Sequence, residues 1–318
     1  MKFAMKEFRY VLASLFWAVL FFPLLIWAQE NYSGEWIRVQ SDNGEFSIEV
    51  PTDYGFYGDK NGFLISRDSE SYQLSEMRML NAYHEKTLLS FEAYKTASPK
   101  AVADIIADRE EKDGKESEIK LGESKFRQIL IKKENLYAVR RYLTSKSHLY
   151  VLTAASRNGE TPVMKRFLDS LAVKNTNAKS QSAPEINSKL KIVPFAALKL
   201  SQIEINQISE PPKKNGDKKA PSSTPIKSHN SLPIAVITKP NPSFTESARQ
   251  KGVEGSIRVR LTFSRNGSIT KIGFLSTLKE GLLREVMFAA IRMKYVPAEK
   301  DGEPVVVTKL VEYAFHLY

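Results

Sequence analysis

The chain has 318 residues, of which 42% are hydrophobic, so it can bury more than one core, and it contains no cysteine. The absence of cysteine excludes disulfides, thiolate nucleophiles and cysteine metal sites. The formal net charge is +11, but no basic run is interleaved with aromatic residues as a single-strand platform requires. We therefore expect a solvated basic surface and no nucleic-acid partner.

The N-terminus has the pattern of an export segment. Lys2, Lys6 and Arg9 precede an uncharged apolar run over residues 11–28, which predicts that the rest of the chain faces the periplasm. The run is about 18 residues long, at the boundary between a long signal peptide and a short membrane span. Cleavage near Ala28 and retention as an inner-membrane anchor, with membrane contact through this segment, both stay open.

Residues 30–173 predict an α+β domain. Runs that alternate apolar and polar residues predict half-buried strands at 36–39 and 46–51. Further strands are expected at 88–94, 126–131, 136–143 and 149–154, spaced like an antiparallel meander. Helices are expected after Ser98-Pro99 and Thr161-Pro162, because a capping residue is followed by a proline in the first turn. The layout resembles PsbP-like envelope domains in pattern only, and no function is carried over from it.

Residues 174–234 are rich in lysine, asparagine, serine and proline, which predicts a flexible basic linker. The middle of this linker, residues 190–200, is too apolar for a pure spacer. We expect a short sticky segment without a fixed role, and the alternatives are packing on a neighbour and transient binding.

Residues 235–318 predict a second, separate α+β domain with the order helix, hairpin, helix, strand. Thr245 can cap a short helix, residues 256–263 alternate with a period of two, and Asn266-Gly267 suits a tight hairpin turn. The apolar residues of the return strand, at 269, 272 and 274, are out of phase. A bulge or a late strand start would explain this.

The second helix of this region is expected after Gly281. Apolar spacing of three and four residues puts Leu283, Val286, Met287 and Ala290 on one face, with Arg284, Glu285 and Arg292 turned outward. The last strand is expected over about 305–317, and the helix would lie over a three-stranded sheet.

Several short motifs in this region resemble the C-terminal domain of TonB family proteins, in register over about a quarter of the chain. They are Phe244, where the family usually has tyrosine, Ala248-Arg249, Gly252, Gly255, Ala289-Ala290, Tyr295 and Pro297-Ala298. The resemblance implies a periplasmic domain of a Gram-negative bacterium. The family's founding members bind outer-membrane receptors and transmit energy to them from the inner membrane.

In the TonB family, the last strand lies at a sheet edge and accepts an extended peptide from a partner. An open edge leaves backbone donors and acceptors unpaired, so an incoming strand gains hydrogen bonds without needing a particular sequence. The resemblance therefore implies these partner-binding residues: Phe244, Leu310, Val311, Glu312, Tyr313, Ala314 and Phe315. For any single one of them, an ordinary core or edge position is the alternative.

The chain departs from the energy-coupling members of the family at its N-terminus. In those members, a histidine one turn from a serine meets the inner-membrane motor complex, whereas here Ser14 is followed by Ala18 and residues 11–28 hold no histidine. Two functions stay open for the C-terminal domain: a TonB-like protein that binds an outer-membrane receptor and couples transport, and a non-energised envelope scaffold or adaptor.

A hydrolase in residues 30–173 is the third hypothesis, and the sequence offers little for it. His84, His148, His229 and His316 are well separated, and none lies at metal-ligand spacing. No phosphate loop, dinucleotide fingerprint or nucleophile elbow occurs. We therefore expect no cofactor, no metal and no enzymatic activity, unless a deep pocket with converging polar groups is found.

Overall fold

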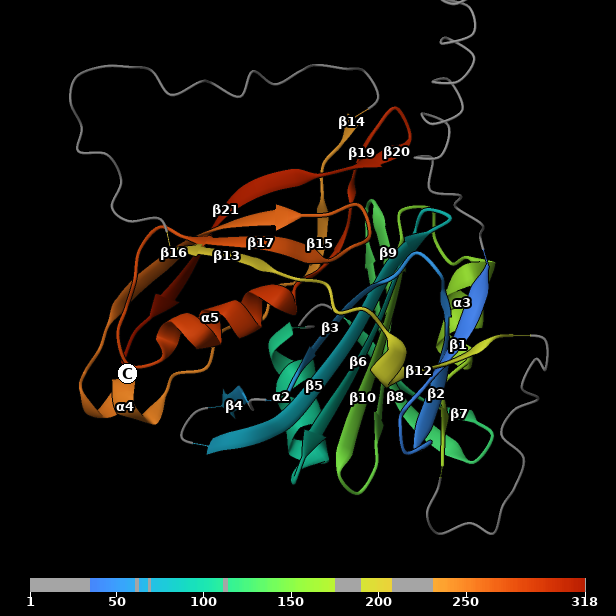
Figure 1. The fold of residues 1–318 in the computed structure, drawn as a ribbon, viewed down its shortest axis with the longest axis horizontal. Helices are drawn as coiled ribbons and strands as arrows, with labels where there is room; N and C mark the ends of the chain where they lie inside the picture. The colour runs from blue at the N-terminus through green and yellow to red at the C-terminus, as the bar shows by residue number, and fades with distance from the viewer. Residues whose placement is uncertain are drawn as a thin grey trace, which may run out of the picture. The chain divides into compact units, whose positions relative to one another are not determined.

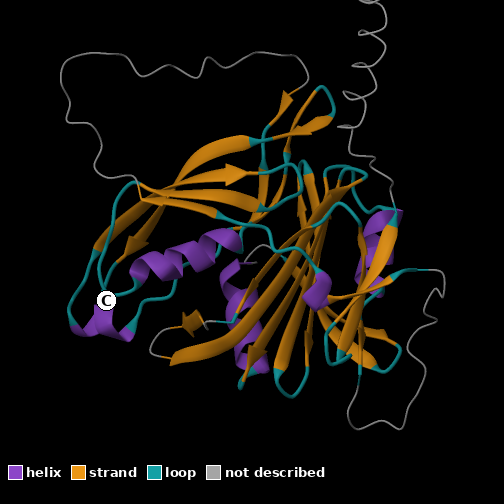
Figure 2. Ribbon diagram, in the orientation of Figure 1, coloured by secondary structure: helices purple, strands orange, loops and turns teal. Residues whose placement is uncertain are grey.

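A computed structural model describes residues 35–60, 63–67, 70–110, 114–174, 190–207 and 231–317. The predicted export segment and much of the predicted linker lie outside these residues. Within them, no helix is long and apolar enough to cross a membrane. The described residues form one compact unit, which is α+β and dominated by strands (Figures 1 and 2).

The largest sheet is antiparallel and has the order β3-β5-β6-β10-β9-β8-β7, with β4 also paired to β5. Consecutive hairpins join the predicted strands β8, β9 and β10 as in a meander, and β7, which was not predicted, pairs with β8. The predicted strand β6 pairs with β10 and not with β8, so it lies out of chain order in the sheet. The strands are β3 (Gly55–Asp59), β4 (Phe63–Arg67), β5 (Glu70–His84), β6 (Thr87–Thr96), β7 (Lys115–Leu121), β8 (Ser124–Lys133), β9 (Leu136–Thr144) and β10 (His148–Ser156).

A smaller sheet has the order β11-β2-β1-β12, from β1 (Trp36–Gln40), β2 (Phe46–Pro51), β11 (Ala172–Val173) and β12 (Ile192–Pro194). The two predicted helices are α2 (Pro99–Glu110) and α3 (Pro162–Asp169). The hydroxyl of Thr161 caps α3 by accepting from the N–H of Met164. The apolar face of α3, with Met164 and Phe167, is buried against this sheet and β6.

The apolar segment in the middle of the linker packs on the N-terminal region. Strand β12 pairs in parallel with β1, and a 3-10 turn over Phe195–Ala197 follows it. The ring of Phe195 is 2% exposed and lies against Phe46 and Phe56. The expectation of a segment without a fixed role is therefore wrong, and packing on a neighbour, one of its alternatives, is what the described residues show.

The C-terminal region contains the predicted helices α4 (Glu246–Gln250) and α5 (Leu282–Ile291) and the predicted hairpin of β16 (Gly255–Phe263) and β17 (Ile269–Phe274). The register of the hairpin shifts between Thr262 and Phe263, so a bulge accounts for the out-of-phase residues. The predicted last strand divides at Val306. The other strands are β13 (Glu204–Gln207), β14 (Ser231–Leu232), β15 (Ala235–Thr238), β18 (Lys294–Val296), β19 (Ala298–Lys300), β20 (Glu303–Val305) and β21 (Val307–Phe315).

One hydrophobic cluster contains residues from both predicted domains, which the sequence analysis treats as separate. Phe63 of β4 stacks on Phe288 of α5 with ring centroids 4.2 Å apart. The hairpin turn at Gly267 lies so close to Leu88 of β6 that a Cβ at Gly267 would meet the Leu88 side chain at 2.3 Å. The predicted boundaries at residues 30–173, 174–234 and 235–318 stay predictions, but the two regions share a core.

Because the two regions share a core, α5 is more buried than predicted. Glu285 and Arg292 were expected to face solvent, and this is wrong: they are 5% and 3% exposed. Arg284 is exposed, as expected. The apolar spacing of the helix correctly predicts that one face of α5 packs on the sheet of its own region. The opposite face is not exposed, because β4 and Tyr94 of β6 cover it.

A buried charge cluster, consisting of Glu92, Arg140, Arg292 and Lys294, lies where the two regions meet. The ammonium of Lys294 is 2.8 Å from Oε1 of Glu92, and a guanidinium nitrogen of Arg140 is 3.7 Å from Oε2. The Glu92 and Lys294 side chains are each 1% exposed. Burial raises the pKa of Glu92, but the charges of Lys294, Arg292 and Arg140 outweigh burial and lower that pKa.

Replacing Glu92 by glutamine should destabilise the fold by about 3–5 kcal/mol, because it leaves buried cations without their carboxylate. Urea unfolding measures this change. The matched control is Glu118→Gln, since Glu118 pairs with Lys125 at 3.2 Å on the exposed surface and should contribute less than about 1 kcal/mol. Equal effects of the two substitutions would show that the buried cluster does not hold the regions together.

Glu285 should make stability depend on pH. Burial raises the pKa of Glu285 from 4.5 to about 7, with Arg284 and the N–H of Leu64 acting in the opposite direction. Because the pKa of this carboxyl group is higher in the folded state than in the unfolded state, its contribution to stability is fully present when the pH is below the unfolded-state pKa. This contribution is lost as the pH rises through the folded-state pKa of about 7. At pH 8, Glu285→Gln should therefore be more stable than the native chain by up to about 3 kcal/mol. This gain should vanish near pH 4.5, and parallel pH profiles of the two proteins would contradict the assignment.

Candidate functional site

The sheet of the C-terminal region has the order β13-β17-β16-β21, so the last strand lies at an edge (Figure 1). The opposite edge, that of β17, is occupied by β13, which comes from the linker and pairs in parallel. Among the described residues, no strand pairs with the outer side of β21. This side of β21 is the candidate functional site.

The hydrogen bonds of β16 show which backbone groups of β21 point outward. The N–H of Arg258 donates to the hydroxyl of Ser276 at 2.8 Å, and the C=O of Arg258 accepts from the N–H of Leu275 at 2.8 Å. The backbone of Arg258 thus points away from β21. Because Arg258 lies opposite Glu312 in the antiparallel register, the backbone of Glu312 points away from β16.

Backbone direction alternates along a strand, so the outward N–H and C=O groups belong to every second residue of β21. These are Thr308, Leu310, Glu312 and Ala314, and the side chains of all four are exposed. The ammonium of Lys239 donates to the C=O of Glu312 at 3.2 Å and lies 5.1 Å from the ring centroid of Tyr313. The Lys239 side chain therefore occupies one backbone acceptor, the C=O of Glu312, on an edge with which no described strand pairs.

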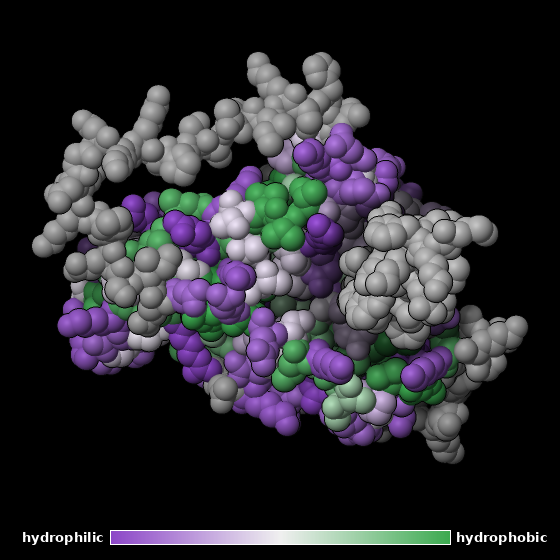
Figure 3. All heavy atoms as spheres, turned by 45° about the horizontal axis from the view of Figure 1, so that its top comes forward, coloured by the Kyte–Doolittle hydropathy of each residue, from purple (hydrophilic) through white to green (hydrophobic). Residues whose placement is uncertain are grey.

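The outer face of the sheet beside this edge mixes apolar and charged side chains. Leu310 is 58% exposed and lies opposite Arg260, while Glu312 lies opposite Arg258. Val306, just before β21, is 53% exposed. Figure 3 shows hydrophobic side chains at the surface among hydrophilic ones. A strand added to β21 would meet both kinds of side chain.

The inner face of β21 belongs to the core. Tyr313 and Phe315 are each 3% exposed, and Val311 is half-buried. The half-buried ring of Phe244 packs edge-on against Phe315 with centroids 5.6 Å apart. Burial raises the pKa of the Tyr313 hydroxyl, which has no hydrogen-bond partner among the described residues.

The structure thus brings the seven predicted partner-binding residues into one region but gives them different exposure. Leu310, Glu312 and Ala314 offer outward backbone groups and exposed side chains, whereas the side chains of Tyr313 and Phe315 are buried. Their role in binding stays a prediction. The sequence analysis omitted Thr308, which the same period of two would have found, and Lys239, which no local pattern indicates.

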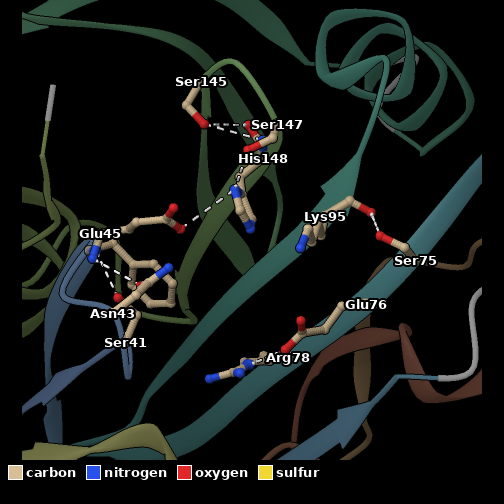
Figure 4. A network of polar contacts seen from close by, with 11 residues as sticks. Ser41, Asn43, Glu45, Ser75, Glu76, Arg78, Lys95, Ser145, Ser147 and His148 are labelled. Atoms are coloured by element: carbon tan, nitrogen blue, oxygen red, sulfur yellow. Dashed lines mark hydrogen bonds and ion pairs between the residues drawn. The ribbon is translucent and has the colours of Figure 1, made fainter. Parts of the chain in front are cut away.

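The N-terminal region has a hollow with polar side chains, the feature that would favour a hydrolase (Figure 4). Ser147 Oγ lies 3.0 Å from Nδ1 of His148, and Oε2 of Glu45 lies 3.8 Å from the same nitrogen. In a serine–histidine–carboxylate relay, the hydroxyl and the carboxylate contact opposite ring nitrogens. These three residues therefore do not form such a relay, and the absence of enzymatic activity stays a prediction.

The other histidines are dispersed. His84 packs edge-on against Trp36 with ring centroids 5.8 Å apart, His316 is exposed, and His229 lies outside the described residues. Within the described parts of the chain, no group of three or more histidine or acidic side chains could hold a metal ion.

Comparison with solved structures gives low overall similarity. The chain is similar to the C-terminal domain of TonB from Pseudomonas aeruginosa (24% identity, TM-score 0.24, 26% of this chain and 86% of that one). It is also similar to a protein from Bacteroides thetaiotaomicron, with 11% identity, a TM-score of 0.28, and coverage of 45% of this chain and 50% of that one. A further similar structure is PsbP (CyanoP) from Synechocystis sp. PCC 6803, with 9% identity, a TM-score of 0.27, and coverage of 44% of this chain and 94% of that one. Likeness at this level says nothing about function.

The sequence of the C-terminal region gives a clearer result. No curated protein matches the chain. Residues 240–317, however, match the family described as "Gram-negative bacterial TonB protein C-terminal". This range contains α4, the β16–β17 hairpin, α5 and the edge strand β21. Residues 240–317 are a TonB C-terminal domain.

Proposed function

We propose that this chain binds a protein of the cell envelope by strand addition to the outer side of β21. A TonB C-terminal domain indicates a location in the envelope and TonB-like partner binding. The observation that carries the proposal is the strand-free edge of β21, at the end of a sheet whose other edge β13 already occupies. The proposed partner is an outer-membrane receptor or another periplasm-facing envelope protein.

The outward groups of β21 set the strength and selectivity of such a complex. Backbone hydrogen bonds contribute about 0.5–1.5 kcal/mol each, so a short added strand binds reversibly and with little sequence preference. Selectivity then comes from the side chains beside the edge. An apolar partner residue would pack on Leu310, and an acidic one would approach Arg258 or Arg260 on the outer face.

The added strand must also displace Lys239 from the C=O of Glu312. This displacement requires little rearrangement, because Lys239 is exposed and an incoming N–H replaces the lost hydrogen bond. The ammonium is then free to pair with a carboxylate of the partner. Charged side chains, lysine above all, commonly protect sheet edges from unwanted pairing, and Lys239 suits that role.

Two versions of this function differ in whether the domain drives transport. The TonB-like version couples transmembrane transport through the inner-membrane motor complex, and it requires retention of residues 11–28 as an anchor. A non-energised scaffold or adaptor is the second candidate, and the absence of histidine from residues 11–28 favours it. N-terminal sequencing of the protein from an envelope fraction separates them: a mature chain that begins at Gln29 would contradict coupling.

Leu310→Pro should weaken partner capture by up to about ten-fold while the domain stays folded. The N–H of Leu310 points away from β16, so proline removes a donor only from the open edge, where proline is tolerated. We expect the free energy of unfolding to change by less than about 1 kcal/mol. Because the chain has no cysteine, Ala314→Cys provides a single site for a photo-crosslinker beside the edge, and crosslinking to an outer-membrane receptor in envelopes is the measurement.

Two controls make this result specific for backbone recognition. Leu310→Ala keeps the N–H and should still give the crosslink, and Ser117→Cys places the same label on the exposed strand β7. If alanine reduced crosslinking as much as proline, the partner would be recognising the side chain. If the proline variant crosslinked normally, the strand-addition proposal would be wrong.

A further inference from the structure

A hollow of about 250 Å³ lies in the N-terminal region, far along the chain from the TonB C-terminal domain. Four segments surround it: the β1–β2 turn, β5, β6 and the β9–β10 turn. In Figure 4 the side chains of Glu45, Arg78, Lys95 and His148 approach the same space from these segments. Phe46 and Ala93, each 5% exposed, give it an apolar floor.

Arg78 is already neutralised within the wall of the hollow. Its Nε lies 2.5 Å from Oε1 of Glu76, and its terminal nitrogen lies 3.3 Å from Oδ2 of Asp42. The guanidinium also lies 5.2 Å from the ring centroid of Phe195. These contacts fix Arg78 as part of the wall, so its charge is not available to attract a ligand.

Apart from Arg78 and its two carboxylate partners, which together carry one excess negative charge, two charges of opposite sign around the hollow have no oppositely charged partner among the described residues. The ammonium of Lys95 makes no hydrogen bond or ion pair with the described residues. The nearest basic group to the carboxylate of Glu45 is the imidazole of His148, at 3.8 Å. Burial lowers the pKa of His148, more than Glu45 raises it, so the ring is neutral at pH 7 and leaves the Glu45 charge unbalanced.

We infer that this hollow binds a small zwitterion carrying one carboxylate and one ammonium group, of the size of an amino acid or a dipeptide. The carboxylate of the ligand pairs with Lys95, and its ammonium pairs with Glu45. The Nε2 atom of His148 and the side-chain amide of Asn43 supply further hydrogen bonds. The volume is slightly below the roughly 300–1,000 Å³ of sites for drug-sized ligands, which suits a smaller molecule.

The charges around the hollow disfavour simpler ions. Asp42, Glu45 and Glu76 outnumber Arg78 and Lys95, so a free anion would meet net negative charge. A simple cation would gain from Glu45 but would be repelled by Lys95. A molecule that presents both signs at separated positions satisfies both groups at once, and its nonpolar part can cover Phe46 and Ala93.

Calorimetric titration of the full chain in mild detergent tests this inference with three related probes. Alanyl-alanine carries both charges, N-acetylalanine only the carboxylate, and alaninamide only the ammonium. We expect alanyl-alanine to bind about ten-fold or more tightly than either singly charged probe, because each lost charge-assisted hydrogen bond reduces affinity by about that factor. Binding of N-acetylalanine with equal affinity would overturn the inference in favour of an anion site.

Four variants assign the binding to the hollow. Lys95→Met and Glu45→Gln should each weaken alanyl-alanine binding about ten-fold or more. Lys120→Met on β7 and Glu123→Gln in the β7–β8 turn make the same chemical changes at exposed positions of the same sheet and should leave affinity unchanged. Absence of binding by the native chain at 10 mM alanyl-alanine, or equal effects of site and control variants, would overturn the inference. Leu310→Pro should bind the probe normally, which keeps this test independent of strand addition.

Discussion

The buried carboxylate of Glu92 is the interaction on which the arrangement of this protein depends. A charge with 1% exposure is stable only with partners of opposite sign held at close range. Arg140 comes from the same sheet, whereas Lys294 and Arg292 come from the C-terminal region. Sliding one region against the other would separate these groups inside an apolar core, so the cluster specifies how β6 and β18 meet.

This contact determines which surfaces of the TonB C-terminal domain stay accessible. The N-terminal region packs on α5, through Phe63 and Phe288, and on the hairpin turn at Gly267. The solvent face of the sheet and the outer side of β21 lie elsewhere, with Leu310 and Glu312 exposed. The domain can therefore be anchored to its neighbour and still offer an edge to a partner. The exposed Lys239 is the one described side chain bonded to that edge.

Local signals in the sequence predict local structure well. Thr161 and Thr245 cap the helices expected after them, and Asn266-Gly267 forms the hairpin turn. The edge position of β21 was also predictable, through the resemblance of its motifs to a known family. Burial of Glu285 and Arg292 and docking of Phe195 were not, because they depend on residues more than a hundred positions away. Lys239 was missed because it lies 73 positions from Glu312 in the sequence, and only the folded chain brings the two together.

The strand that the linker contributes to the sheet makes the two edges of that sheet unequal. A sheet with two open edges can pair on both sides, and copies of such a sheet can polymerise edge to edge. Here β13 covers the β17 side and becomes the edge there, but it has only four residues, whereas β21 at the other edge has nine. The longer edge is the one that can pair with a foreign strand over most of its length, and two copies that pair through β21 leave no room for another partner on that side.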